Sequence, residues 1–159
     1  MKSRQLANVI PALAIALGGV AASNAHGQHS DGGSSTEKAV DYRNSYMTIL
    51  SWNAKPMGKM LKGETPFDAA AFTLHARQLA NASGLDLLWA FPEGSVTEDS
   101  GAREEIWFDW EDFEQKFADF RTAASALGEA AEGGDVEAVK SAFGKVGDTC
   151  KACHEAYKE

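Results

Sequence analysis

Apolar residues recur at alternating intervals of four and three along one stretch in the second half of the chain. They are Ile106, Trp110, Phe113, Phe117, Phe120, Ala124, Leu127 and Ala131. Positions three and four apart share one face of an α-helix, so the pattern predicts a long helix whose apolar stripe packs against other helices. We expect this helix to begin near Arg103 and to end at Gly133-Gly134, because glycine is common just after a helix.

A second heptad pattern lies near the start of the chain and predicts a helix over residues 37–61. Ser34 and Glu37 can form a capping box before it, and Pro56 is expected to kink or loosen its last turns. The apolar stripe of this helix is expected to contain Val40, Arg43, Met47, Leu50, Ala54, Met57 and Leu61.

Two further helices complete the pattern. One is predicted to start with Thr65 as its N-cap and Pro66 at its first position, and to stop at Gly84. The other follows Asp135 as N-cap, and its stripe contains Val136, Val139, Phe143, Val146, Cys150, Cys153 and Tyr157.

The four stretches predict an all-α fold. No run of alternating apolar and polar residues is long enough to indicate a strand. Helices on a heptad rhythm with mostly short connections are typical of an antiparallel four-helix bundle. The one long connection, about residues 92–102, is rich in turn residues and is expected to be a loop.

The N-terminus predicts export. Residues 1–25 combine a basic start, an apolar run and small residues, which is the layout of a secretory signal peptide; an uncleaved anchor is the alternative. Residues 26–36 are polar and rich in glycine and serine, so we expect a flexible leader before a single domain over residues 37–159. The expected location is the periplasm, with no membrane span after cleavage.

The charge of the chain excludes some classes of partner. Its formal net charge is −8, and removal of Lys2 and Arg4 with the first 25 residues makes it −10. An acidic protein of this kind is not expected to bind nucleic acid or anionic membranes. A basic protein partner fits the charge.

The chain has two cysteines, and both belong to the sequence Cys150-Lys-Ala-Cys153-His154. On a helix these three side chains project to the same side. Two thiols at this separation can add to the vinyl groups of one haem while the histidine ligates its iron, and Cys-x-x-Cys-His is the attachment signature of c-type haem. A helical thiol-redox or metal-binding module without haem is the alternative.

Arg43 is a charge within the predicted apolar stripe of the first helix. Such a charge is costly to bury unless it is paired. A haem propionate is a suitable partner, and we favour it over two alternatives, in which Arg43 reaches the surface or pairs with a nearby acidic side chain.

The chain resembles cytochrome c′ and its low-spin relatives, the class II c-type cytochromes. The resemblance covers essentially the whole mature chain and is carried by residues 42–47, 102–107 and 143–158, which read YRNSYM, AREEIW and FGKVGDTCKACHEAYK. A haem motif on the last helix is specific to this class, because ordinary cytochromes c carry theirs near the N-terminus.

The resemblance implies roles for particular residues. Cys150 and Cys153 would hold one covalently attached haem c, and His154 would be the proximal iron ligand. Arg43 and Asn44 would lie beside the haem, with Met47 over its distal face. Aromatic residues would line the pocket, namely Trp89, Phe91, Phe113 and Phe120. Lys158 stands where family members often have an arginine, which puts the role of that arginine in doubt.

Two functions are open within this resemblance, and neither is enzymatic. With a five-coordinate iron, the protein would bind nitric oxide or carbon monoxide. With Met47 as sixth ligand, it would shuttle single electrons to an unidentified redox partner. His75 is a second candidate ligand, although a satisfied core histidine is the more common case. Family members often form homodimers through their first two helices, and the stripes of this chain leave that assembly open.

Overall fold

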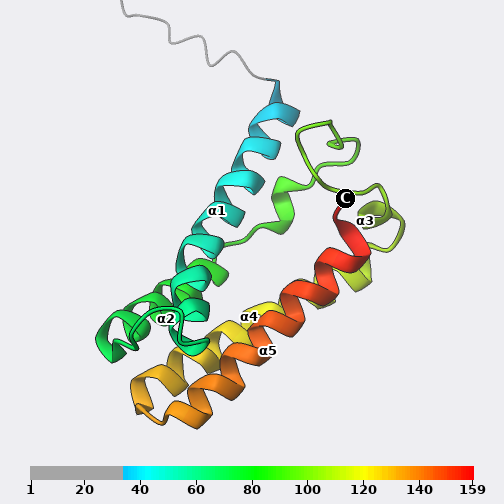
Figure 1. Ribbon diagram of the computed structural model, residues 1–159. Helices are drawn as coiled ribbons and strands as arrows, with labels where there is room; N and C mark the ends of the chain where they lie inside the picture. Colours follow the sequence, from blue (N-terminus) through cyan, green and yellow to red (C-terminus); the bar gives the residue numbers. More distant parts are fainter. Residues whose placement is uncertain (1–33) are drawn as a thin grey trace, which may run out of the picture. The chain divides into compact units, whose positions relative to one another are not determined.

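The computed structural model describes residues 34–159. The predicted signal peptide and residues 26–33 of the predicted leader lie outside the described residues. The prediction of a four-helix bundle is confirmed by its main helices, α1 (Ser35–Leu61), α2 (Ala69–Ser83), α4 (Trp110–Gly133) and α5 (Val136–Tyr157). Figure 1 shows them side by side, and α1 packs on α2, α2 on α4, and α4 on α5.

The connection between α2 and α4 is long and carries two short helices, η1 (Leu88–Ala90) and α3 (Glu105–Phe108). Within residues 34–159 there is no strand, and the only β-type pairing is an isolated bridge between Ala102 and Lys158. None of the helices in this described part is long and apolar enough to cross a membrane.

Helix α1 begins as its capping signals predict. The Ser34 hydroxyl accepts a hydrogen bond from the Glu37 amide at 3.2 Å, and the Glu37 carboxylate accepts one from the Ser34 amide. This reciprocal pair satisfies two of the amides left free at a helix start. The helix therefore starts two residues earlier than predicted, and it continues through Pro56 to Leu61.

The buried stripe of α1 differs from the predicted stripe by one position. The two share Val40, Arg43, Leu50 and Met57. In the second half of the stripe, the structure buries the residues that precede Met47, Ala54 and Leu61. The buried residues of α1 are Ala39, Val40, Arg43, Tyr46, Asn53, Met57 and Met60, with Leu50 partly buried. The prediction placed the apolar residues Met47 and Ala54 in the stripe because their neighbours Tyr46 and Asn53 are polar, and at these positions it was wrong.

Asn53 can be buried because both polar atoms of its side-chain amide have a partner. Its Nδ2 donates to the Ile49 carbonyl at 2.9 Å, and its Oδ1 lies 3.1 Å from Nδ1 of His75 on α2. A buried polar side chain costs little when its hydrogen-bonding groups have partners. His75 is thus a half-buried histidine engaged with Asn53.

Helix α2 begins three residues later than predicted, at Ala69 and not at Pro66. Its N-cap is Asp68, whose carboxylate accepts from the Ala71 amide at 3.0 Å, so the prediction of Thr65 as N-cap is wrong. Phe67, just before the cap, packs on Phe72 with ring centroids 5.6 Å apart. This is a hydrophobic staple, and it fixes the start of the helix at Asp68. The helix ends at Ser83, before Gly84, as predicted.

The third predicted helix is interrupted near its start. Residues Glu105–Phe108 form the short helix α3, and the chain breaks at Asp109, where φ is −133° and ψ is 58°. The Asp109 carbonyl accepts from the Phe113 amide at 3.1 Å and from the Tyr157 hydroxyl of α5 at 3.3 Å. The contact from α5 stabilises the interruption at Asp109. Because Tyr157 is far from Asp109 in the sequence, the spacing of apolar residues within this helix could not predict it.

Beyond the break, the heptad prediction for α4 is confirmed from Phe113 to Ala131, whose apolar positions are buried. The turn into α5 is also as predicted. Gly134 adopts a left-handed conformation with φ of 74°, which favours glycine, and the Asp135 carboxylate caps α5 by accepting from the Glu137 and Ala138 amides.

The cap of α2 gives a direct test. Asp68→Ala is expected to lower the free energy of unfolding by about 1 kcal/mol, the usual cost of losing an N-cap. The matched variant Thr65→Ala is expected to change it by less than about 0.5 kcal/mol. Urea unfolding of the haem-loaded protein measures both. A larger loss for Thr65→Ala than for Asp68→Ala would contradict the assignment.

Candidate cofactor site

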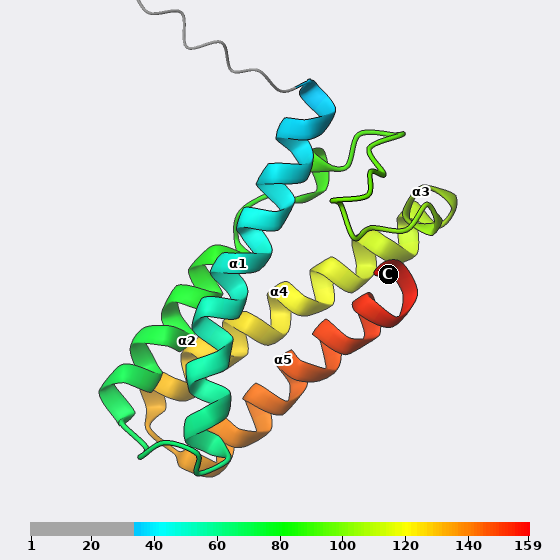
Figure 2. The same cartoon turned by 45° about the horizontal axis from the view of Figure 1, so that its top comes forward.

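A cavity of about 680 Å³ lies between α1 on one side and α4 and α5 on the other. Figures 1 and 2 show that α1 and α5 diverge toward the end of the bundle that carries the last turns of α5. The cavity volume is in the range of sites for small molecules and cofactors. Its lining is largely apolar, with a few polar groups.

The wall formed by α5 carries the three residues of the Cys-x-x-Cys-His sequence. Cys150, Cys153 and His154 all line the cavity, and both cysteines are free thiols. Helical spacing brings them together, because positions three and four apart share one face.

The electrostatics of this wall favour neutral side chains. Burial raises the pKa of the Cys150 thiol and of the Cys153 thiol, so neither resembles the low-pKa thiolate of a redox cysteine. Burial, helped by the charge of Lys158, lowers the pKa of His154. A neutral imidazole is the form that binds a metal. Residues 34–159 contain no group of three or more His, Cys, Asp or Glu residues arranged to hold a metal ion.

Arg43 lies on the opposite wall and is 3 % exposed. Its Nη1 donates to the Ala90 carbonyl at 2.9 Å and to the Ser95 hydroxyl at 2.7 Å, and its Nη2 donates to the Ser95 carbonyl at 2.7 Å. Its guanidinium also lies over the Phe91 ring, 4.6 Å from the centroid. Both alternatives to a propionate partner, exposure at the surface and pairing with a nearby acid, are therefore wrong.

The hydrogen bonds of Arg43 use three of its five N–H groups, and the N–H of Nε is among those left free. Its Nε is buried without a partner, and the residue lines the cavity. Burial lowers the pKa of the guanidinium, yet arginine stays charged at any physiological pH. A buried cation bonded only to neutral oxygens, with an unused N–H, suits an anionic group in the cavity.

Two neighbouring residues of the α1 wall differ in exposure. Met47 lines the cavity but is 39 % exposed, whereas the neighbouring Tyr46 is 2 % exposed and its hydroxyl has no partner. The sequence analysis missed Tyr46. Its heptad register with Ala39, Asn53 and Met60 was the signal that could have found it. Asn44 also lines the cavity, and its Nδ2 donates to the Asp99 carbonyl at 3.1 Å.

Three of the four predicted aromatic residues line the cavity, namely Phe91, Phe113 and Phe120. Phe91 and Phe113 pack edge to face with centroids 4.8 Å apart. Trp89 is the exception and corrects the prediction, because it is 66 % exposed and does not line the cavity. The short helix η1 turns Ala90 inward and Trp89 outward, where its ring packs on Tyr42 at 5.3 Å.

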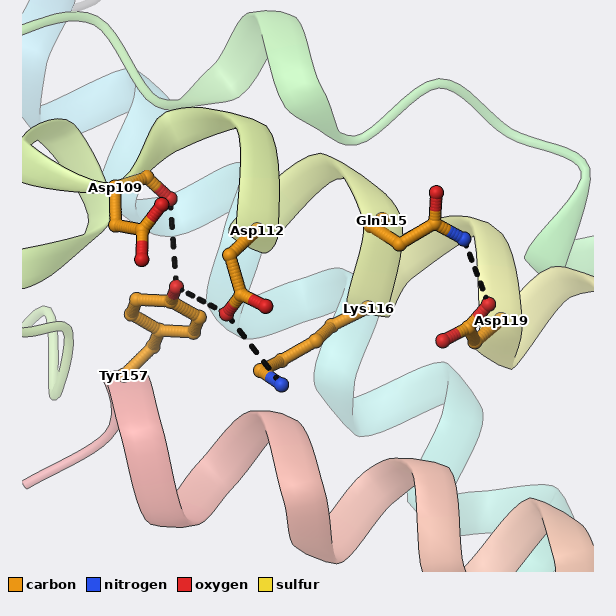
Figure 3. A network of polar contacts seen from close by, with 6 residues as sticks. All are labelled: Asp109, Asp112, Gln115, Lys116, Asp119 and Tyr157. Carbon is orange, nitrogen blue, oxygen red and sulfur yellow. Dashed lines mark hydrogen bonds and ion pairs between the residues drawn. The ribbon is translucent and has the colours of Figure 1, made fainter.

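The last turn of α5 is fixed by a polar network, shown in Figure 3. The Tyr157 hydroxyl donates to the Asp112 carboxylate at 2.6 Å, and the Lys116 ammonium lies 3.4 Å from the same carboxylate. The Tyr157 ring packs edge to face on Phe113, with centroids 5.3 Å apart. On the other side of this turn, the Arg103 amide donates to the Tyr157 carbonyl at 3.0 Å. His154 is thus on a helix end held from two sides.

The residues present fit a haem. Two thiols and a neutral imidazole lie on one wall, and a buried cation with a free donor lies on another. Aromatic rings between them suit a flat apolar ring system. Cys150, Cys153 and His154 could hold it, and Arg43 could bind its carboxylate.

Comparison with known proteins agrees with this geometry. The family model for cytochrome C′ matches residues 38–158. A cytochrome c′ from Alcaligenes xylosoxydans xylosoxydans is 40% identical over 123 residues, covering 77% of this chain and 94% of the relative.

Solved structures show the same similarity. Cytochrome c prime from Shewanella frigidimarina matches with a TM-score of 0.75 and 38% identity, covering 78% of this chain and 96% of that one. The nitric oxide complex of a mutant of cytochrome c prime from Alcaligenes xylosoxidans matches with a TM-score of 0.70 and 38% identity, covering 78% and 95%.

The Tyr157 network predicts a pH-dependent stability. Tyr157→Phe is expected to lower the thermal midpoint by a few degrees at pH 7, because it removes the hydrogen bond to Asp112 and keeps the ring. That bond, followed by Lys116, lowers the pKa of Asp112, so its contribution is complete above about pH 4 and is lost as the pH falls further. The difference between wild type and Tyr157→Phe should therefore narrow below about pH 4.

At alkaline pH the contribution of Tyr157 to stability falls as the pH rises. Burial, then Asp112 and Asp109, raise the pKa of Tyr157, so its contribution is complete below about pH 10 and is lost only above that value. Thermal unfolding at several pH values measures both limits, with Tyr42→Phe as the matched control. An equal difference between wild type and Tyr157→Phe at pH 7 and well below pH 4 would contradict this account.

Proposed function

The chain belongs to the cytochrome c′ family, and from that membership we propose that it is an exported haem protein whose iron cycles one electron and binds nitric oxide or carbon monoxide. Proteins of this family carry covalently attached haem c, and the two cysteines of this chain fit that attachment. When bound, the haem supplies a redox-active iron with room for a small ligand. One observation carries the proposal: an apolar cavity with Cys150, Cys153 and His154 on one wall and a buried cation on another.

The proposed roles follow from the chemistry of each residue. Cys150 and Cys153 form the thioether bonds, and the neutral imidazole of His154 is the proximal ligand of the iron. Arg43 binds a haem propionate through its free Nε. Asn44 lies near that group, and Phe91, Phe113 and Phe120 exclude water from the ring.

Met47 decides between the two kinds of function. We propose that it is a flexible lid and that the sixth position of the iron is open, because α1 turns Tyr46 inward and leaves Met47 partly exposed. The second candidate is a low-spin electron carrier with Met47 as sixth ligand. The observation that favours it is that Met47 also lines the cavity. Neither candidate is an enzymatic function.

The cellular setting is part of the proposal. Residues 1–25 act as a signal peptide and the mature protein works in the periplasm. A redox partner protein, of basic surface, supplies or accepts the electron. The nitric oxide complex of a similar cytochrome c prime supports a gas ligand. A homodimer through the first two helices is supported by large exposed apolar side chains on α1 and α2, namely Ile49, Trp52 and Leu74.

Covalent attachment gives the first test. The purified protein is expected to keep its haem after denaturation in acid and acetone, whereas the double variant Cys150→Ser, Cys153→Ser is expected to lose it. His75→Ala, which removes a histidine engaged with Asn53, is the matched control and should keep the haem. A haem-free wild type with two titratable thiols would establish the thiol-redox or metal-binding alternative.

Optical spectra give the second test. We expect the reduced protein to show broad high-spin bands that shift when carbon monoxide is added. Met47→Ala should leave these bands nearly unchanged, because Met47 does not ligate the iron in this proposal. Sharp, split bands that ignore the gas in wild type, and that become gas-sensitive in Met47→Ala, would instead establish Met47 as the sixth ligand.

A further inference from the structure

Tyr46 is a buried polar residue that the proposed function does not use. It lies on α1, is 2 % exposed, and lines the same cavity as His154. Its hydroxyl has no hydrogen-bond partner within the protein. Native structures leave few buried donors without partners, because each one destabilises the fold. A donor of this kind on a cavity wall indicates a partner inside the cavity.

The environment of the ring fixes its position and its protonation. Its centroid lies 6.3 Å from that of Phe117 on α4. The pKa of Tyr46 is raised to about 12, mainly by burial. The nearby Arg121 lowers this pKa and Tyr42 raises it, both to a smaller extent than burial. The hydroxyl therefore keeps its proton at physiological pH and can donate a hydrogen bond.

Neighbouring groups on the cavity wall do not offer Tyr46 an acceptor. The free group of Arg43, one helical turn before it, is an N–H donor. Lys116, across the cavity on α4, is a cation already paired with Asp112. The other α4 residues of the lining, among them Phe120, are apolar. The α1 wall also carries the polar side chains of Asn44, Thr48 and Ser51, which donate to main-chain carbonyls and make no hydrogen bond with the Tyr46 hydroxyl. An acceptor must come from what the cavity holds.

We propose that Tyr46 is the distal hydrogen-bond donor of this site, and that its hydroxyl donates to a small oxygen-containing ligand held at the iron. Tyr46 lies on the α1 wall, whereas His154 lies on the α5 wall, so the two approach the cavity from different helices. Donors in the distal pocket govern which small molecules a haem holds. The inference rests on the proposed function, and it makes Tyr46 a specificity-determining residue that favours ligands with a partly negative oxygen.

The test compares Tyr46→Phe with wild type in the haem-loaded, reduced full-length protein under carbon monoxide. The matched control is Tyr42→Phe, on the same helix but outside the cavity lining. A hydrogen bond to the ligand oxygen weakens the C–O bond, so the C–O stretching band should move to higher wavenumber in Tyr46→Phe alone. Exchange into heavy water should shift the band in wild type and in Tyr42→Phe, but not in Tyr46→Phe.

Affinity provides a second readout. The dissociation constant for carbon monoxide should rise about three- to tenfold in Tyr46→Phe, the change expected from losing one neutral hydrogen bond. The thermal midpoint of the unliganded variant should not fall, since the hydroxyl has no partner in the protein. A purely structural tyrosine would show the reverse, with a lower midpoint and an unchanged stretching band.

The remaining outcomes separate the inference from the proposed function. If wild type takes up no carbon monoxide, the open-site proposal fails, and the same comparison is made in the Met47→Ala background, where the sixth position is free. An identical band and affinity with and without the hydroxyl, in whichever background binds the gas, would overturn the role of Tyr46. A changed reduction potential with an unchanged band would also overturn it, by assigning the hydroxyl to a propionate.

Discussion

The buried guanidinium of Arg43 joins the two parts of the molecule that enclose the cavity. It ties α1 to the connection between α2 and α4 through the oxygens of Ala90 and Ser95. Hydrogen bonds from a buried cation are stronger than neutral ones, and losing them would leave buried oxygens unpaired. One side chain therefore closes this end of the site and keeps a positive charge in it. Both the position of the loop and the suitability of the cavity for an anionic cofactor depend on that residue.

A small bundle can hold a cavity open only if the helices around it are fixed elsewhere. At the other end, α2 and α4 approach closely, since a Cβ added to Gly128 would lie 3.3 Å from the Cβ of Ala80. Near the open end, Tyr157 binds both Asp109 and Asp112 at the start of α4. Close helix packing therefore fixes one end of the bundle and polar contacts fix the other. Together they keep the helices that form the cavity walls apart.

The sequence predicted those features that depend on local spacing. The register of α4 from Phe113 onward and the placement of Cys150, Cys153 and His154 on one face of α5 follow from helical periodicity alone. The errors lie where tertiary contacts decide. Asn53 is buried because His75 meets it from another helix, and the break at Asp109 depends on a hydroxyl of α5. Tyr46 was missed for a related reason. Its polar hydroxyl kept it out of the predicted apolar stripe, although the structure buries it on the cavity wall.

The order of contacts between helices bears on how the chain assembles. The main helices pack chiefly on their neighbours in the sequence, α1 on α2, α2 on α4, and α4 on α5. Contacts that are near in sequence favour rapid folding, because little loop entropy is lost before they form. Helix α5 comes last and meets the bundle mainly through α4. Because α5 meets the bundle chiefly through a single main helix, we expect Cys150 and Cys153 to stay accessible to whatever joins them to the cofactor until that one contact has formed.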